Sequence, residues 1–428
     1  MLSTVLRRGA VFVFVLTASA AQATTYYVAT SGNDGNPGTL SQPWKTLQHA
    51  ADRIVAGDTV RVRAGNYAGA NFETPGTAAR PIVLEAYTGE SPAITADNPV
   101  TPDGINLEGA SYMTVQGFTV NGRTRAGIRA VTCNHVTIRN NRMDANGYWG
   151  ILTGFCDDLL IDHNVTSRSV RQHGIYVGNS GDRPVIRRNF VWGNTGSGIH
   201  MNGDESQGGD GIISGAIVEA NTINGNGTSG SGINMDGVQN SVIRNNLLYN
   251  NHASGISLYQ IDGGGPSTGN RVLNNTVIVA SNGRWALNIQ DGASNTTLRN
   301  NILYNLGSYR GVIDISADSL SGTTSDYNAV MNRFTTDDGD SILTLAQWRT
   351  QTGQDAHSFV ATPAQLFVNV SGNDYHLSPS SPAVDHGVTL ADVPTDLAGT
   401  TRPQGAAYDV GAYELTGNPV FSHGFESE

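Results

Sequence analysis

The feature that most constrains this chain is an internal repeat whose period falls in the range typical of solenoid proteins. A Gly-Ile pair recurs at Gly127, Gly150, Gly174, Gly198, Gly232 and Gly255, and Ala286 takes the same slot in a further repeat. Most of these steps are nearly equal, whereas the steps into Gly232 and into Ala286 are longer. Asparagine, often doubled, marks a β-rich run some ten residues before most of these pairs, at Asn140-Asn141, Asn164, Asn189, Asn221, Asn245-Asn246, Asn274-Asn275 and Asn300-Asn301.

A step as long as that from Gly127 to Gly150 fits one coil of three short strands and three turns. Coils of parallel strands stack about 4.8 Å apart, and stacked asparagines can hydrogen-bond along the stack. Alternating Val, Ile and Leu would fill a narrow interior. The rival solenoid, a leucine-rich repeat, requires an L-x-x-L-x-L signature that the chain lacks. We therefore predict an all-β chain, a right-handed parallel β-helix, with the repeat strongest from Val100 to Ile315.

The segments outside the repeat predict export and two caps. Arg7-Arg8, an apolar run and Ala21-Gln22-Ala23 are typical of a secretory signal, which places the protein outside the cytoplasm: secreted, periplasmic or at the cell surface. Helical spacing over Trp44–Ile54 predicts a capping helix, and a short helix is expected at Leu343–Gln351. The predicted organisation is a signal peptide (1–23), an N-terminal cap with the first coils (24–99), the β-helix core (100–324), a C-terminal cap (325–414) and a flexible tail (415–428).

The two cysteines share the repeat. Cys133 and Cys156 are separated by the same step as Gly127 and Gly150, so each follows its coil's glycine at the same offset. They should stack on adjacent coils within disulfide reach, and an oxidising compartment permits the bond. The alternative is a pair of stacked, reduced thiols.

Charge limits the partners. The net charge is −11, and Lys45 is the one lysine, so all the other basic residues are arginines. This balance disfavours nucleic acid and anionic membranes, both of which need a basic surface. It leaves a polysaccharide as partner, including an acidic one, since a few local arginines can outweigh the global charge. We expect a monomer.

The strand after each Gly-Ile pair predicts a polar surface. If the isoleucine points inward, the next residue and the one two further on point outward. From coil to coil these outward residues are Leu152 and Gly154, Tyr176 and Gly178, His200 and Asn202, Asn234 and Asp236, Ser257 and Tyr259, Asn288 and Gln290. From Tyr176 onward the column is rich in hydrogen-bonding groups.

The two long repeat steps hold extra sequence, residues 203–211 and 262–267. Both insertions leave the coil just after the polar strand, so they should overhang the same edge. Insertions on one side of a solenoid commonly build its binding face. We therefore predict a groove between the coils of Gly174 and Ala286, in which a linear glycan could meet about one coil per sugar.

Several groove residues are candidates for chemistry. His200 and His173 could act as acid or base, because histidine titrates near neutral pH. Asp236 could be an acid, a nucleophile or a metal ligand, and Tyr176 or Tyr259 could bind sugar faces or donate a proton. Each has a simpler explanation: a solvated histidine, a turn-forming Asp-Gly, a surface tyrosine. The predicted substrate-binding residues are Asn202, Asn234, Asn288, Gln290, Arg171 and Gln260.

The first insertion is also a candidate cation site. Asp204, Glu205 and Asp210 could hold Ca²⁺ through oxygen ligands. Acidic loop residues often bind nothing, so a solvated loop is the alternative.

Near the amino terminus the chain has a run that resembles a known family: YYVATSGNDGNPGT at Tyr26–Thr39, followed by PWKTLQHA at Pro43–Ala50. This run resembles the opening of secreted bacterial β-helix proteins, including the pectate lyases of polysaccharide lyase family nine. The segments Gly232–Val238, Asn251–Tyr259 and Asp409–Glu414 are similar to a broad branch of the same proteins. The resemblance implies the fold over nearly the whole mature chain.

Departures from the family limit what carries over. The family-nine lyases use a lysine base beside an aspartate-bound calcium, whereas Lys45 falls in the predicted capping helix. The Asp-Pro-His-Glu-Gln run of the alginate C5-epimerases is absent. We transfer no catalytic residue, since fold alone does not license function.

Three functions remain open from the sequence. The first is a lyase that cleaves a uronate-containing glycan by β-elimination, with His200 as base and a tyrosine as acid. The second is a glycoside hydrolase using Asp236 with Asp204 or Asp262. The third is a glycan-binding surface protein without catalysis.

Overall fold

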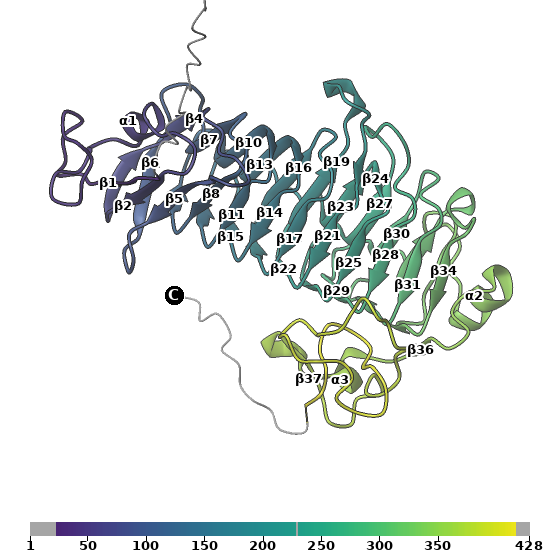
Figure 1. The fold of residues 1–428 in the computed structure, drawn as a ribbon. Helices are drawn as coiled ribbons and strands as arrows, with labels where there is room; N and C mark the ends of the chain where they lie inside the picture. The colour runs from purple at the N-terminus through teal and green to yellow at the C-terminus, as the bar shows by residue number, and fades with distance from the viewer. Residues whose placement is uncertain (1–22, 228–229, 417–428) are drawn as a thin grey trace, which may run out of the picture.

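A computed structural model describes residues 23–227 and 230–416 of the chain. The predicted signal peptide, apart from its last residue, and nearly all of the predicted tail lie outside these residues. Figure 1 shows one elongated stack of strands with a lobe of irregular chain against one flank.

The stack consists of three long parallel sheets that run the length of the molecule. The first sheet contains β1 (Thr25–Val28), β2 (Thr59–Val62), β5 (Ile82–Ala86), β8 (Met113–Gln116), β11 (Thr137–Arg139), β14 (Leu160–Asp162), β17 (Val185–Arg187), β21 (Ile217–Glu219), β25 (Val242–Arg244), β28 (Arg271–Leu273), β31 (Thr297–Arg299) and β34 (Thr324–Asp326). The second contains β3 (Gly65–Ala68), β6 (Pro92–Ala96), β9 (Thr119–Asn121), β12 (Arg142–Asp144), β15 (Val165–Ser167), β18 (Phe190–Trp192), β22 (Thr222–Asn224), β26 (Leu247–Tyr249), β29 (Thr276–Val279), β32 (Ile302–Asn305), β35 (Ala329–Val330) and β36 (Phe359–Val360).

The third sheet carries the Gly-Ile strands. It contains β4 (Ala70–Phe72), β7 (Ile105–Glu108), β10 (Ala126–Asn134), β13 (Trp149–Asp157), β16 (Ile175–Gly178), β19 (Ile199–Asn202), β23 (Ser231–Asp236), β27 (Ser254–Tyr259), β30 (Trp285–Ile289) and β33 (Ile313–Ile315). Two short pairs lie outside these sheets: β20 (Ile213–Ser214) with β24 (Val238–Gln239), and β37 (Phe367–Asn369) with β38 (Asp374–Leu377).

The predicted parallel β-helix is confirmed, and it extends past both ends of the visible repeat. β1 pairs with β2 in register, and β36 still pairs with β35. The first coils were hard to see because they lack the asparagine and Gly-Ile marks and show only the alternation of buried and half-buried residues, as in β2.

The predicted asparagine ladder runs through the interior of one corner. Each buried side-chain amide donates to the Oδ1 of the next coil's asparagine at 2.9–3.1 Å, in the order Asn141, Asn164, Asn189, Asn221, Asn246, Asn275, Asn301 and Asn328. A second ladder at another corner joins Asn194, Asn226 and Asn251. These bonds satisfy polar groups at turns where the backbone leaves the sheets.

Each repeat glycine sits at a crowded inner corner. A Cβ on Gly198 would lie 2.5 Å from Ile223 Cγ2 and 2.7 Å from the carbonyl oxygen of Gly232 in the next coil. The interior between the sheets is one continuous cluster of buried Ile, Val and Leu. Close packing at the corner therefore explains why the slot takes glycine, or at most alanine.

The predicted disulfide is present. Cys133 and Cys156 are register partners on β10 and β13, and their sulfurs are bonded. The two thiols are therefore part of the stack.

The helices are few and short. α1 (Leu47–Ala51) is shorter than the predicted Trp44–Ile54, and Lys45 precedes it instead of lying within it. α2 (Leu345–Thr352) nearly coincides with its prediction, with Leu345 and Trp348 buried. The others are α3 (Pro363–Leu366) and the 3-10 turns η1 (Glu205–Gln207), η2 (Ala317–Ser319) and η3 (Val370–Gly372). Among the described residues, none of the helices has the length and apolar character needed to cross a membrane.

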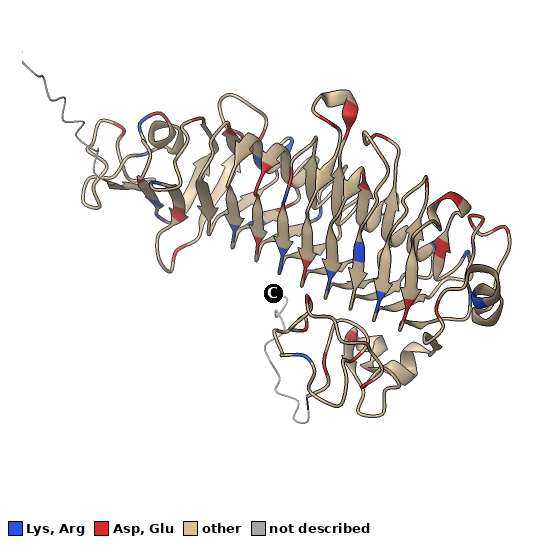
Figure 2. Ribbon diagram, turned by 45° about the vertical axis from the view of Figure 1, so that its right-hand side comes forward, with Lys and Arg blue, Asp and Glu red and all other residues tan. Residues whose placement is uncertain are grey.

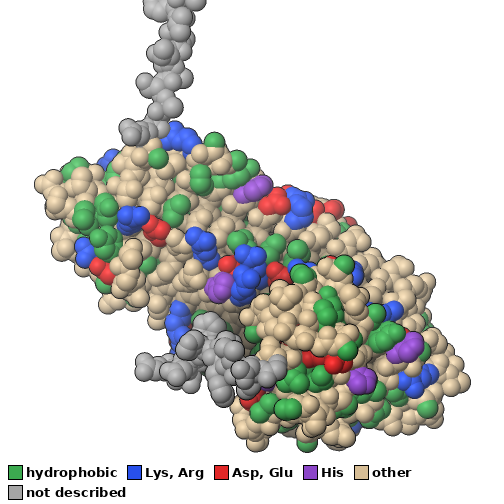
Figure 3. All heavy atoms as spheres, turned by 60° about the horizontal axis from the view of Figure 1, so that its bottom comes forward, with side chains coloured by type: hydrophobic (Ala, Val, Ile, Leu, Met, Phe, Trp, Pro, Cys, Tyr) green, Lys and Arg blue, Asp and Glu red, His purple; other side chains and the backbone are tan. Residues whose placement is uncertain are grey.

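The carboxyl-terminal lobe packs along the flank of the second sheet (Figures 1 and 3). Leu247, Ile278 and Ile302 of that sheet share an apolar cluster with Phe367 and Val410 of the lobe. A fully buried ion pair between Arg402 and Glu414 ties the lobe together. The lobe thus buries apolar side chains that point outward from the second sheet and would otherwise be exposed to solvent.

Candidate functional site

The third sheet places the predicted polar residues in two parallel columns. Tyr176, His200, Asn234, Ser257 and Asn288 are successive register partners, and so are Gly178, Asn202, Asp236 and Tyr259. The inward residues between them are buried Ile, Val, Met and Leu. The register predicted from the Gly-Ile slots therefore holds for these coils.

The two insertions meet over one edge of this sheet. The Glu205 N–H donates to the Asp262 carbonyl at 2.9 Å, and the Gly264 N–H donates to the Gly211 carbonyl at 2.8 Å. The first insertion also reaches back, since the Gly211 N–H donates to Ser180 Oγ at 2.8 Å. Figure 2 shows acidic residues, in red, on a loop that projects from the stack. The two insertions, residues 203–211 and 262–267, thus form a wall along the edge of the polar columns where the strands end.

Asp236 anchors this wall. Its carboxylate accepts the backbone N–H groups of Ile261, Asp262 and Gly263 at 2.9, 2.8 and 3.1 Å, and the residue is 1% exposed. Both oxygens are therefore committed to the second insertion. This arrangement does not support the hypothesis of Asp236 as acid, nucleophile or metal ligand, because a carboxylate buried in loop N–H groups has no free face for substrate.

The predicted calcium ligands do not converge. Asp204 accepts the Ser206 hydroxyl, and Asp210 accepts the Ile212 N–H, each within its own turn. Over residues 23–227 and 230–416 no three Asp, Glu, His or Cys side chains are grouped to hold a metal ion. We derive no step through calcium.

His173 and His200 form a hydrogen-bonded pair beneath the groove. The Ser197 N–H donates to His173 Nδ1 at 2.8 Å, and His173 Nε2 lies 3.0 Å from His200 Nδ1. Because His173 Nδ1 accepts, its proton must be on Nε2, which then donates to His200. The proton of His200 is consequently on Nε2.

This tautomer leaves the Nε2–H of His200 as a donor. His200 Nε2 is buried and has no hydrogen-bond partner in the described part of the chain. Burial lowers the pKa of His173 to about 4, and burial together with His173 holds the pKa of His200 well below its usual range. The pair is thus neutral at neutral pH, and His200 presents an N–H where the hypothesis of a base requires a lone pair.

Tyr176 lies flat across its strand. A Cβ on Gly178 would be 2.5 Å from the Tyr176 ring, so glycine at that position makes room for it. The ring meets His200 edge-on at 5.3 Å between centroids. Burial raises the pKa of Tyr176 to about 12, although a hydrogen bond from Asn202 opposes the shift. The hydroxyl is therefore protonated and can donate.

Tyr259 occupies the other side of the groove floor. Asn234 Nδ2 donates to Tyr259 Oη at 2.6 Å, which leaves the phenolic proton free to donate elsewhere. Burial, with the charge of Asp236 next, raises the pKa of Tyr259 far above neutral. Asn202 Nδ2 lies 3.3 Å from Asp262 Oδ2, and Asp262 is exposed on the wall. The groove therefore combines neutral donors with one exposed carboxylate beside them.

The last coil contains a residue that sequence reasoning missed. Asp314 on β33 is the register partner of Asn288, and it accepts the side-chain amides of Asn288 and Gln290. It is fully buried, and burial raises its pKa to about 7. These bonds commit the two predicted substrate-binding amides to Asp314. The signal was Ile313-Asp314-Ile315, a charge in the outward slot of one further coil.

The remaining predicted residues lie at the two edges. Gln260 Nε2 donates to the Gly263 carbonyl at 3.0 Å and so braces the wall. Arg171 is exposed at the opposite edge, where its Nη1 donates to Tyr148 Oη at 2.8 Å. Trp149 also faces this edge, with its ring centroid 5.9 Å from that of Tyr176. Neither Tyr148 nor Trp149 was predicted, because the outward column was counted only from after the glycine.

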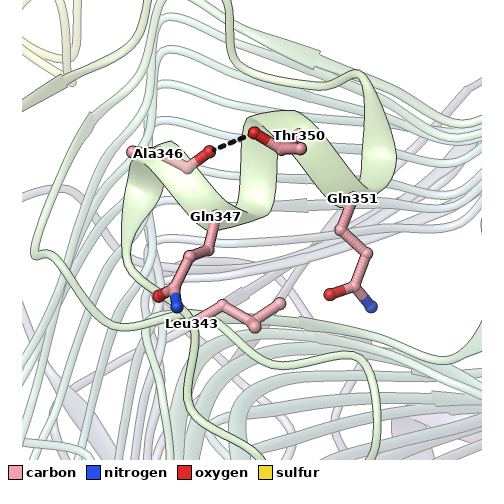
Figure 4. Close-up of a pocket in the computed structure, with 5 residues that line it drawn as sticks. All are labelled: Leu343, Ala346, Gln347, Thr350 and Gln351. Carbon is pink, nitrogen blue, oxygen red and sulfur yellow. Dashed lines mark hydrogen bonds between the residues drawn. The ribbon is translucent and has the colours of Figure 1, made fainter.

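Two hollows lie away from these residues. One is lined by Leu343 and by residues of α2, which carry no ionisable group there (Figure 4). Another, near α1, is lined by Lys45, Gln48, Tyr67 and Asp97 among others. α1 lies at the opposite end of the stack from β27 and β30 (Figure 1), so Lys45 is far from the polar columns.

Comparisons with known proteins agree with this architecture. Residues 26–158 match the family of Pel9A-like right-handed β-helix regions, and residues 149–334 match a family described as a right-handed β-helix region.

Two curated relatives match part of the chain. It is 27% identical over 217 residues to the pectate lyase PEL9 of Emericella nidulans, covering 45% of this chain and 52% of that protein. It is 25% identical over 130 residues to the uncharacterised protein YwoF of Bacillus subtilis, covering 27% of this chain and 28% of that protein. The chain thus spans about half of the first relative and less of the second.

Solved structures resemble it over more of its length. The pectate lyase Pel9A matches with a TM-score of 0.62 at 16% identity, covering 92% of this chain and 97% of that one. An alginate lyase from Paenibacillus sp. matches with a TM-score of 0.52 at 20% identity, covering 68% and 97%. At these identities the likeness shows the fold alone.

Proposed function

We propose that this Pel9A-like right-handed β-helix is a secreted polysaccharide lyase that cleaves a uronate-containing glycan by β-elimination. The observation that carries the proposal is the cluster of neutral donors on the groove floor. His200 Nε2–H has no partner in the described part of the chain, and the Tyr259 phenol retains its proton. The disulfide supports an oxidising compartment.

In β-elimination, the enzyme neutralises the uronate carboxylate. This makes the adjacent C5 proton more acidic, so that a base can remove it. Uncharged donors held in a dry site stabilise the developing enolate, because they are fixed before the reaction begins. His200 Nε2–H and the Asn202 amide suit this role. The tight coupling of His200 to His173 keeps the donor oriented.

The remaining roles fall to the wall and the second column. Asp262 is exposed, contacts Asn202 and is close enough to raise the pKa of both tyrosines. We assign Asp262 as the base that removes the C5 proton. The electron pair forms the C4–C5 double bond, the C4–O bond breaks, and Tyr259 gives its phenolic proton to the leaving oxygen.

The hydrolase hypothesis loses support, because it requires two free carboxylates across one bond and the carboxylate of Asp236 is occupied. The binding-protein hypothesis makes a different prediction for product formation. It expects uronate binding without any unsaturated ends.

The test is incubation of the full mature chain with pectate, alginate and glycosaminoglycans, with and without added Ca²⁺. The expected result is a rise in ultraviolet absorbance from unsaturated uronate ends on at least one acidic polymer. Reducing ends without unsaturation would instead indicate a hydrolase. Flat traces across the whole panel under both conditions would overturn the proposal.

A further inference from the structure

The residue before each repeat glycine forms a third column, at the edge where the strands begin. His173 contacts His200 from this position, and Ser231 Oγ lies 2.8 Å from Ser257 Oγ. The column therefore borders the groove opposite the wall. Strand register gives its members from β13 to β30 as Trp149, His173, Ser197, Ser231, Ser254 and Trp285, and Ala126 of β10 precedes Trp149.

This edge column is alike on the two sides of its middle. His173 and the serines fill the stretch from β16 to β27, and a tryptophan flanks this stretch on each side. Each tryptophan has an arginine near it: Arg284 Cζ lies 5.2 Å from the centre of the Trp285 ring. At the other end, Arg171 Cζ lies 5.1 Å above Tyr148, whose ring is 5.3 Å from that of Trp149.

Both arginines are exposed and lack an acidic partner. In the described part of the chain neither Arg171 nor Arg284 makes an ion pair, whereas Arg310, which also lies over Trp285, pairs with Asp338. A guanidinium held on an aromatic face is pre-positioned to bind a carboxylate with two parallel hydrogen bonds. The acidic wall on the other edge would repel an anionic chain toward this edge.

Unsatisfied polar atoms accompany the arginines. Trp149 Nε1, Ser197 Oγ, Ser254 Oγ and Trp285 Nε1 are buried and have no hydrogen-bond partner within residues 23–227 and 230–416. Buried polar groups without partners are uncommon and call for an explanation such as a bound water or a ligand. Trp149 is only half-buried, so a ligand at this edge could reach it.

We propose that Arg171 and Arg284 form two terminal subsites that bind carboxylates of one polyuronate chain lying along the groove. Five coil steps separate Trp149 from Trp285. Because one coil step is about as long as one sugar unit, the span accommodates roughly five sugars. The inference rests on the proposed function for its substrate class and adds a minimum chain length to it.

Binding of uronate oligomers tests the inference apart from cleavage. Trimers and heptamers of galacturonate, mannuronate and guluronate are titrated by calorimetry into the full chain carrying Tyr259→Phe, which we expect to slow turnover. The expected result is that R171Q and R284Q each weaken heptamer binding by about tenfold, as expected for loss of a charge-assisted pair. A trimer cannot reach both ends, so its affinity should change much less with either variant alone.

Three controls complete the design. Arg139→Gln removes an exposed arginine on the first sheet and should leave binding unchanged. R171K and R284K keep the charge and should retain part of the affinity. A methyl-esterified heptamer should bind equally to all variants.

The outcomes separate the two proposals. Heptamer affinity that is unchanged in R171Q and R284Q would overturn this inference, even if the wild type cleaves a polyuronate. Failure of the wild type to bind any uronate oligomer would overturn the proposed function, and the inference with it.

Discussion

His173 Nε2–H donates a hydrogen bond to His200 Nδ1 across 3.0 Å. The Ser197 N–H on the far side of His173 fixes the direction of that bond. A backbone amide on the edge of the sheet thereby decides which nitrogen of His200 is protonated. Side-chain chemistry in the groove thus depends on the register of the coils.

The pair predicts a loss of stability in mild acid. Burial lowers the pKa of His173 to about 4 and lowers that of His200 further, whereas in the unfolded chain both titrate near 6.5. Between these values the unfolded state binds more protons, so stability falls as pH drops from about 6.5 toward 4. Thermal unfolding followed from pH 7 to pH 4 should show this decline, and a flatter profile in His173→Gln. An identical profile in that variant would contradict the buried neutral pair.

Asp314 predicts the opposite dependence of stability on pH. Burial raises its pKa to about 7, so the folded protein retains a proton that the unfolded chain releases near pH 4. Stability from this group is therefore full below pH 4 and is lost as pH rises to 7. Asp314→Asn should stabilise the protein at pH 8 by about 1 kcal/mol or more, measured by chemical denaturation, because it removes a buried charge. Asp318→Asn, an exposed neighbour, should change stability little; equal effects would refute the assignment.

Asp236 should behave as an anchor of the wall. Asp236→Asn weakens three backbone hydrogen bonds, which we expect to reduce the free energy of unfolding by about 2 kcal/mol. It should also increase hydrogen exchange at residues 261–263. Activity should fall in kcat as well as in KM, because the displaced wall carries Asp262, the assigned base. A large fall in kcat with unchanged loop exchange would instead make Asp236 a catalytic residue.

The asparagine ladder should stabilise the fold by more than the sum of its individual hydrogen bonds. Asn221 is fully buried and joins Asn189 to Asn246. Asn221→Ala removes the acceptor of the Asn189 backbone N–H and side-chain amide and the donor to the Ile186 carbonyl, so we expect a loss of about 2–4 kcal/mol by chemical denaturation. Asn66→Ala, at an exposed position on β3, should lose under about 0.5 kcal/mol. A similarly small loss at Asn221 would mean that the ladder does not hold the corner.

The sequence was sufficient to predict the coils wherever a Gly-Ile pair or a repeated asparagine marked them. Gly-Ile slots and asparagines fix the register, so the columns from Tyr176 to Asn288 and the Cys133–Cys156 bond followed from spacing alone. The flank packing was missed because outward Leu247 and Ile278 sit in apolar runs that a buried strand also shows. They face the lobe, and no local pattern indicates a contact so distant in sequence.

Roles within the groove were harder to predict than positions. Alternation shows that Asp236 and His200 face outward, but not that loop N–H groups surround Asp236 or that Ser197 sets the tautomer of His200. Those properties depend on backbone groups from other coils. Trp149 and Trp285 were missed because the outward column was counted only from the residue after the repeat glycine, or after Ala286 in the last of these coils.

The central claim is that Tyr259 protonates the leaving oxygen in a β-elimination. The most direct measurement is the rate at which unsaturated uronate ends form on the acidic polymer that the wild type cleaves, compared among wild type, Tyr259→Phe and Tyr87→Phe. We predict a loss of about a hundredfold or more in kcat for Tyr259→Phe, with substrate affinity and unfolding temperature retained, and no change for Tyr87→Phe. Unsaturated product formed by Tyr259→Phe at the wild-type rate would contradict the account.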